Sequence, residues 1–287
     1  MVLTVRKVVV AYALEGKDRE IVRDALRGAA AAIYLPDLDG AGRADALRDA
    51  DAVLARTTRE FRAGEMALLR NVRLLQFINA GIDHVPLADL PAGVPVATNA
   101  GAYAGPMAEH ALAMALAAAK RLPMEHAALA RGEFNQFAPN RMLAGGVCGI
   151  LGFGGIGVAT ARLARAIGMK VHAINRRGRS EEPTDWIGTP DQLDILLATS
   201  DVLVICTPLT PATLGMIGAS QLARMKPDAI LVNVARGEIV DECALYERLV
   251  AFPGFFACID AWWIEPIRHG SFRMDQPFMS LPNVIGS

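Results

Sequence analysis

The sequence predicts an α/β protein made of two doubly wound domains, each built on a parallel sheet. The chain has 287 residues, and at roughly 150 residues per domain this length is enough for two separate hydrophobic cores. Short apolar runs alternate with amphipathic stretches, which is typical of βαβ units. The alternation runs to about residue 99 and restarts at Val147. We therefore expect a first domain over residues 1–99 and a second over residues 100–287.

The individual elements follow this alternation along the chain. In the first domain, apolar runs at residues 8–11, 52–54 and 74–77 predict strands, and residues 18–30 and 63–69 are amphipathic. A helix is expected from about Pro106 to Arg121, followed by a loop over residues 131–141, where Gly, Asn and Pro break the periodicity. In the second domain, we expect strands near Val147, Val171, Val202, Ile230 and Phe255.

A glycine-rich run lies between the expected strand at residues 147–151 and an Ala-rich helical stretch. It is Gly152-Phe153-Gly154-Gly155-Ile156-Gly157. In this pattern the first glycine permits a tight turn, the second lets the backbone approach a pyrophosphate, and the third lets helix and strand pack closely. The helix N-terminus attracts the phosphate charge. We expect a Rossmann-type dinucleotide site with contacts from Gly152, Gly154, Gly155, Ile156 and Gly157.

The end of the next expected strand bears on which dinucleotide binds. An acidic residue usually stands there and binds the ribose hydroxyls, but here the sequence is Asn175-Arg176-Arg177. Guanidinium groups can bind a 2′-phosphate bidentately, whereas a carboxylate would repel it. We therefore expect NADP to be preferred, with NAD possible, through Asn175, Arg176 and Arg177. The alternative is a solvated basic turn without a ligand.

Polar residues follow several of the expected strands. Ligands of open α/β sheets bind beyond the carboxyl ends of the strands, so these segments are candidate site residues. They are residues 206–211, 233–237, 260–266 and, in the first domain, 78–83.

These segments carry motifs in the order of a known family. The motifs are Asn79-Ala80-Gly81-Ile82-Asp83, Thr98-Asn99-Ala100, Ala108-Glu109-His110, Gly152 to Gly157, Pro208 to Pro211, Val234 to Glu242, and Asp260 to Pro266. With them the chain resembles the D-isomer-specific 2-hydroxyacid dehydrogenases over nearly its whole length. The resemblance implies a flavodoxin-like substrate domain into which the nucleotide domain is inserted, and a homodimer formed through the nucleotide domain.

The resemblance also implies roles for particular residues. Arg236 would bind the substrate carboxylate and polarise the carbonyl, and Glu265 would be the carboxylate partner of a catalytic histidine. Asp260 would contact the nicotinamide end of the cofactor, with Thr207, Pro208, Val234 and Ala235 beside it. The backbone of Ala80 and Gly81 would hold the substrate carboxylate. Structural alternatives remain: Arg236 could be a turn charge, Glu265-Pro266 an ordinary turn, and Asp260 a cap.

The chain departs from the family pattern at its end. The family's catalytic histidine follows the strand that begins here at Leu281, but the sequence stops at Ser287. We expect the histidine and the returning segment of the substrate domain to lie beyond residue 287, as in a truncated chain; the alternative is a protein that has lost its acid. His269, four residues after Glu265, is the nearest substitute, whereas His84, His110 and His172 do not match the family's acid.

Composition excludes several other classes of protein. The net charge is −1, so no basic excess indicates nucleic acid or lipid. The apolar run at residues 111–119 is far shorter than the roughly 20 residues of a membrane span, and no signal peptide is evident, which predicts a cytoplasmic protein. The cysteines lack metal-ligand spacing, and we expect buried reduced thiols without metal.

The expected function is that of an NADP-preferring oxidoreductase. It would interconvert a small 2-oxo acid, such as glyoxylate or hydroxypyruvate, and the (R)-2-hydroxy acid. A regulatory protein that binds the cofactor without turnover is the alternative, because fold alone does not separate the two. A short-chain dehydrogenase is excluded, since no tyrosine has a lysine four residues later.

Overall fold

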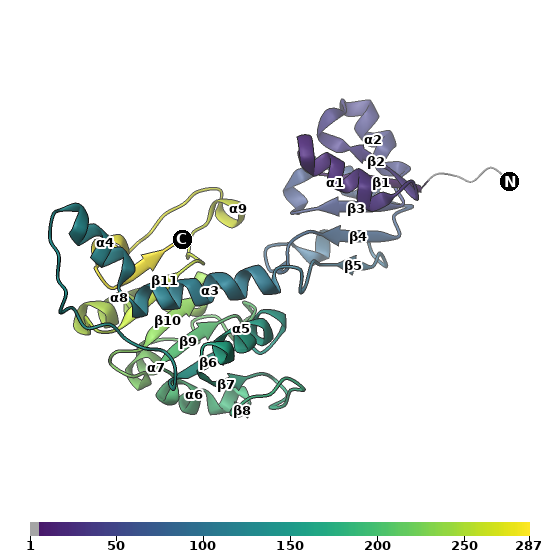
Figure 1. Cartoon of the computed structure of the whole chain (residues 1–287). Coiled ribbons are helices and arrows are strands. Elements are labelled where there is room, and N and C mark those ends of the chain that lie inside the picture. The colour runs from purple at the N-terminus through teal and green to yellow at the C-terminus, as the bar shows by residue number, and fades with distance from the viewer. Residues whose placement is uncertain (1–5) are drawn as a thin grey trace. The chain divides into compact units, whose positions relative to one another are not determined.

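The computed structural model describes residues 6–287, which fold into two compact units. Unit 1 extends to Ala102, and unit 2 runs from Tyr103 to Ser287. Unit 1 contains a five-stranded sheet and unit 2 a seven-stranded sheet (Figure 1). Every strand pair in both sheets is parallel. The predicted α/β class with two parallel sheets is confirmed.

Unit 1 has the strand order β2-β1-β3-β4-β5, which is the flavodoxin-like order. Its strands are β1 (Arg6–Val10), β2 (Ala30–Tyr34), β3 (Ala52–Ala55), β4 (Leu74–Phe77) and β5 (Val96–Ala97), and its helices are α1 (Gly16–Leu26) and α2 (Gly40–Arg48). Val53, Leu75 and Phe77 lie in its buried core.

Two expected elements of unit 1 differ from the structure. The amphipathic stretch at residues 18–30 is divided, because α1 ends at Leu26 and β2 begins at Ala30. Arg27 and Gly28 between them have φ of 46° and 75°, a left-handed geometry that commonly terminates helices. The stretch at residues 63–69 forms only a short 3-10 helix, Glu65–Leu68.

Unit 2 has the strand order β12-β11-β10-β9-β6-β7-β8. Counted from β6, this is the Rossmann order with one further strand, and the order reverses between β6 and β9. The strands are β6 (Val147–Leu151), β7 (Lys170–Ile174), β8 (Trp186–Gly188), β9 (Val202–Ile205), β10 (Ile230–Asn233), β11 (Phe256–Ile259) and β12 (Val284–Gly286). The structure thus has strands at all five expected places, has β12 within the strand expected from Leu281, and adds β8.

Helices cover both faces of the unit 2 sheet. They are α3 (Ala104–Ala119), α4 (Leu122–Ala130), α5 (Gly155–Ala166), α6 (Leu193–Thr199), α7 (Ala219–Arg224), α8 (Glu242–Ala251) and α9 (Pro266–His269). Helix α3 runs across one face and contacts α5, β10 and β11 (Figure 1). Helices α6, α7 and α8 contact one another in sequence order and pack on the other face.

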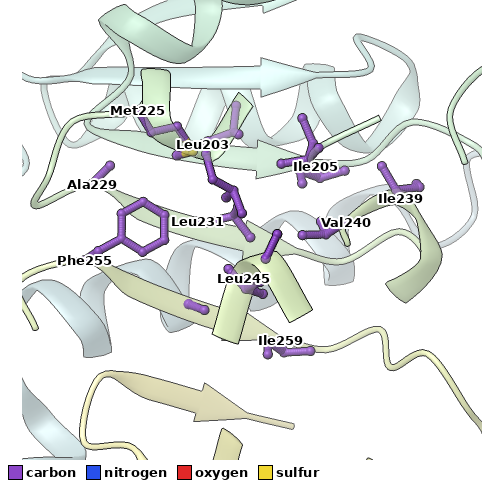
Figure 2. Packing of buried hydrophobic residues seen from close by; sticks show 14 of the residues in the cluster. Leu203, Ile205, Met225, Ala229, Leu231, Ile239, Val240, Leu245, Phe255 and Ile259 are labelled. Carbon is purple, nitrogen blue, oxygen red and sulfur yellow. The ribbon is translucent and has the colours of Figure 1, made fainter. Parts of the chain in front are cut away.

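Alternation along the strands produces the two cores of unit 2. In β9, Val202 and Val204 belong to the cluster under α3 and α5, whereas Leu203 and Ile205 belong to the cluster under α6, α7 and α8. Figure 2 shows the second cluster, in which Leu245 of α8 lies over side chains from neighbouring strands. Strands buried on both faces read as continuous apolar runs, which is why these strands were visible in the sequence.

Candidate active site

The glycine-rich run forms a turn between β6 and α5 at the point where the strand order reverses. Gly152 has φ of 102°, and a Cβ there would lie 2.5 Å from the backbone nitrogen of Thr207. A Cβ on Gly157 would lie 2.4 Å from the Gly152 carbonyl oxygen, whereas one on Gly154 would meet no atom within 4 Å. Gly154 is the N-cap of α5. Gly152 and Gly157 are therefore needed for close packing within the protein, whereas the space beside Gly154 at the helix N-terminus is open. A pyrophosphate site requires this arrangement.

The segments after β9 and β10 lie beside this turn. Cys206 donates its backbone N–H to Leu151 and its thiol to the Gly152 carbonyl oxygen, with Sγ–O of 3.0 Å. The Val234 backbone N–H bonds to Ile205 in the neighbouring strand. These contacts bring the predicted residues Thr207, Pro208, Val234 and Ala235 to the same edge of the sheet as the glycines.

Asn175 uses its side chain within its own loop. Its Oδ1 accepts from the backbone N–H of Arg177 at 2.9 Å, and its Nδ2 donates to the Arg179 carbonyl at 2.9 Å. Arg176, Arg177 and Arg179 are exposed. Asn175 thus shapes the loop that carries these guanidinium groups, and its contact with a cofactor stays a prediction.

A buried asparagine organises the turn that carries Arg236. Asn233, the last residue of β10, is 2% exposed; its Nδ2 donates to the Arg236 carbonyl, and its Oδ1 accepts from Ala235. The Asn233 carbonyl accepts from Asp260, the first residue after β11. Asn233 therefore links two predicted site segments. The sequence placed Asn233 in a candidate site segment but gave it no specific role; an asparagine at the end of an apolar run was the available signal.

Glu265 is the N-cap residue of α9. Its carboxylate accepts from the backbone N–H of Trp262 at 2.9 Å. Glu265 and Asp260 line one cavity of about 310 Å³, together with Trp262 and Phe272. Trp262 is 7% exposed and belongs to the hydrophobic core as well as to this wall.

The histidines near the site have defined partners. His269 Nδ1 accepts from the Glu265 backbone N–H at 3.0 Å, and Nε2 lies 4.0 Å from Glu238 Oε1. His110 of α3 lies with Nε2 3.3 Å from Asp260 Oδ1 and 3.0 Å from Ser287 Oγ. Sequence analysis missed this contact, because 150 residues separate His110 from Asp260. In β7, burial lowers the pKa of His172.

The predicted substrate residues of unit 1 follow β4. Ala80 and Gly81 lie in a loop whose start is fixed by Asn79, which donates Nδ2 to the Arg56 carbonyl and accepts at its own carbonyl from Asn99. Asn79 Nδ2 is also 3.4 Å from His84 Nε2.

The cysteines differ in exposure. Cys148 and Cys258 are buried, Cys206 is intermediate and Cys243 is exposed, so the expectation of buried thiols is wrong for Cys243, which lies on α8. Within residues 6–287, no three potential ligand residues are grouped as a metal site. No helix in that range combines the length and apolarity needed to cross a bilayer.

The chain is similar in sequence to known dehydrogenases. Residues 112–287 match the sequence model of the D-isomer specific 2-hydroxyacid dehydrogenase, NAD binding domain. The chain is 35% identical over 232 residues to a glycerate dehydrogenase of Methylorubrum extorquens, which covers 78% of this chain and 70% of that protein. It is 31% identical over 252 residues to a D-3-phosphoglycerate dehydrogenase of Archaeoglobus fulgidus, covering 86% of this chain but only 47% of that protein.

One solved structure is also similar to this chain over nearly its whole length. The crystal structure of a glycerate dehydrogenase related protein from Thermoplasma acidophilum has 31% sequence identity and a TM-score of 0.69. The alignment covers 98% of this chain and 90% of that chain.

Proposed function

The chain belongs to the D-isomer specific 2-hydroxyacid dehydrogenase family, and we propose that it interconverts a small 2-oxo acid and its (R)-2-hydroxy acid with NAD(P). The observation that carries this proposal is the linkage of the Arg236 turn to Asp260 through Asn233, at the same sheet edge as the glycine turn. Unit 2 would be the nucleotide domain and unit 1 the substrate domain.

The nicotinamide, when bound, supplies or accepts the hydride. The protein's own residues bind, orient and polarise the substrate. Arg236 binds the carboxylate of the 2-oxo acid bidentately and polarises its carbonyl. Glu265 would orient the group that donates a proton to the nascent alkoxide, and Asp260 would help to hold the nicotinamide end of the cofactor. In unit 1, the backbone of Ala80 and Gly81 is the proposed substrate-binding segment.

Binding of a substrate analogue tests the activity directly. Oxamate, an unreactive isostere of pyruvate, should bind to the protein–NADPH complex, and a screen of 2-oxo acids including glyoxylate and hydroxypyruvate should reveal NADPH oxidation. Arg236→Ala should abolish both while leaving NADPH affinity within a few-fold, because a charged contact to a desolvated carboxylate is worth about 2–5 kcal/mol. NADPH binding without oxamate binding or turnover would contradict the proposal and favour a cofactor sensor.

NADP is the proposed preferred cofactor. Arg176 and Arg177 are exposed, and within residues 6–287 no carboxylate pairs with either. By contrast, nearby Arg162 is paired with Glu182 at 2.6 Å. NADPH should bind at least about tenfold tighter than NADH, roughly 1.4 kcal/mol. Titration of the wild type and an Arg176→Ala, Arg177→Ala double variant with both cofactors tests this, and equal wild-type affinities would refute it.

The apolar arm, residues 122–142, supports a homodimer. Exposed apolar side chains gather on α4 and the segment after it: Leu122, Leu129, Phe134, Phe137 and Met142, of which Phe137 is 92% exposed. Large exposed apolar groups of this kind mark interaction surfaces. The wild type should have the mass of a dimer in light scattering, and Phe134→Asp with Phe137→Asp should give a monomer. A monomeric wild type would exclude this assembly.

A further inference from the structure

An ion pair joins the two segments that carry Arg236 and Glu265. Glu238 lies two residues after Arg236, and Arg268 lies three residues after Glu265. Arg268 Nη1 is 2.9 Å from Glu238 Oε2, and Nη2 is 2.7 Å from Oε1. The side chains are only 13% and 21% exposed. A bidentate, largely buried pair of this kind is among the stronger and more directional side-chain contacts.

The Arg236 turn is held independently of this pair. The Asn233 side chain hydrogen-bonds the Ala235 N–H and the Arg236 carbonyl, and Ile217 pairs with Val240 in an isolated bridge. A Cβ on Gly237 would lie 2.5 Å from the Trp262 and Trp263 backbone, so the turn packs directly on the chain before Glu265. The Arg236 turn is therefore held in place by contacts other than the Glu238–Arg268 pair.

Helix α9, in contrast, buries none of its own residues. It has four residues, and its apolar side chain, Ile267, is 68% exposed. Helices this short are not stable without tertiary contacts. His269 accepts from the Glu265 N–H within α9, and its Nε2 makes a longer contact of 4.0 Å with Glu238 Oε1. Arg268 is the least exposed residue of α9, and its partner belongs to the Arg236 turn.

We propose that Glu238 and Arg268 are positioning residues that fix Glu265 relative to Arg236. This inference rests on the proposed function for the roles of Arg236 and Glu265. Catalytic groups must be held to a fraction of an ångström, because misplacement of about 1 Å can cost about a hundredfold in rate. The pair provides that constraint for a helix that lacks a hydrophobic anchor.

The experiment compares Arg268→Met, Glu238→Gln and the double variant with wild type. Arg268→Met should raise amide hydrogen exchange in a peptide covering residues 264–270 by about tenfold or more, because local opening governs exchange. Exchange in α5 should not change. With the best 2-oxo acid, kcat should fall at least about tenfold, while oxamate and NADPH affinities stay within about threefold because Arg236 remains in place.

Two further variants separate positioning from general destabilisation. Arg268→Lys keeps the positive charge but loses the bidentate geometry of the guanidinium, so its kcat should lie between those of Arg268→Met and the wild type. Arg273→Met removes an exposed pair with Asp275 on the same segment, with side chains 65% and 53% exposed, and should leave exchange and kcat at wild-type values. The double variant should be no worse than the more impaired single variant, because each single change already breaks the Glu238–Arg268 ion pair.

The outcomes distinguish the two proposals. Unchanged exchange at residues 264–270 in Arg268→Met would overturn the positioning role whether or not the protein turns over a 2-oxo acid. Increased exchange with wild-type kcat would also overturn it. A wild type that neither binds oxamate nor turns over any 2-oxo acid would overturn the proposed function, while the exchange data would still decide whether the pair holds α9.

Discussion

Alanine at two glycines of the dinucleotide turn should have opposite consequences. Gly154 has open space around it, and its φ of −99° and ψ of −154° are accessible to alanine. A Cβ on Gly157 would lie 2.4 Å from the Gly152 carbonyl oxygen and 3.0 Å from Ile150 Cγ2. Gly154→Ala should therefore affect ligand binding, and Gly157→Ala should affect folding.

The magnitudes follow from these contacts. At Gly154, reduced freedom of the unfolded chain stabilises by about 0.4–1 kcal/mol, and the poorer N-cap costs a similar amount, so stability should change by less than about 0.5 kcal/mol. At Gly157, overpacking costs about 1–3 kcal/mol, partly offset by up to about 1 kcal/mol of helix propensity. The net loss should be about 1–2 kcal/mol, or several degrees in Tm.

Tryptophan fluorescence measures this unfolding selectively. The three tryptophans, Trp186, Trp262 and Trp263, all lie in unit 2, so their thermal transition reports the unit that contains the turn. Gly154→Ala should keep the wild-type Tm but bind NADPH at least about tenfold more weakly, because its methyl group lies where the pyrophosphate approaches. Wild-type affinity in Gly154→Ala, or a wild-type Tm in Gly157→Ala, would refute this account of the turn.

Three further predictions concern other parts of the chain. One thiol should react rapidly with Ellman's reagent at pH 8, and this reaction should be lost in Cys243→Ser. Cys243 is exposed, whereas burial raises the pKa of Cys148, Cys206 and Cys258 to about 12 and leaves those three thiols protonated. The hydrogen bond from Arg43 lowers the pKa of Glu65. The pair should therefore stabilise unit 1 fully above the unfolded pKa of about 4.3, and progressively less as pH falls below it. Glu65→Gln should cost about 3 kcal/mol of stability at pH 7 and should make the melting temperature, followed by circular dichroism, depend less on acid pH. Asn175→Ala should weaken NADPH binding several-fold without changing NADH binding, as measured by fluorescence titration, since it removes both loop hydrogen bonds.

Local patterns were sufficient for much of this fold. The β-strands of unit 2 are buried on both faces, so β6, β9 and β10 appear as apolar runs that need no tertiary information. The glycine turn was equally visible, since its requirements are set by adjacent residues. The division of residues 18–34 into α1 and β2 was not predicted, because Ala-rich sequence suits either state and the outcome depends on pairing with β1.

The sequence by itself therefore determined the α/β class, the dinucleotide turn and the segments that carry Arg236, Asp260 and Glu265. Only the tertiary structure decided which side chains meet across those segments. The contacts of His110 with Asp260 and of Glu238 with Arg268 join residues 150 and 30 positions apart, and no periodicity encodes such distances. The physical reason is that hydrophobic alternation and glycine conformation act between near neighbours, whereas strand order and helix packing set which distant side chains share a site.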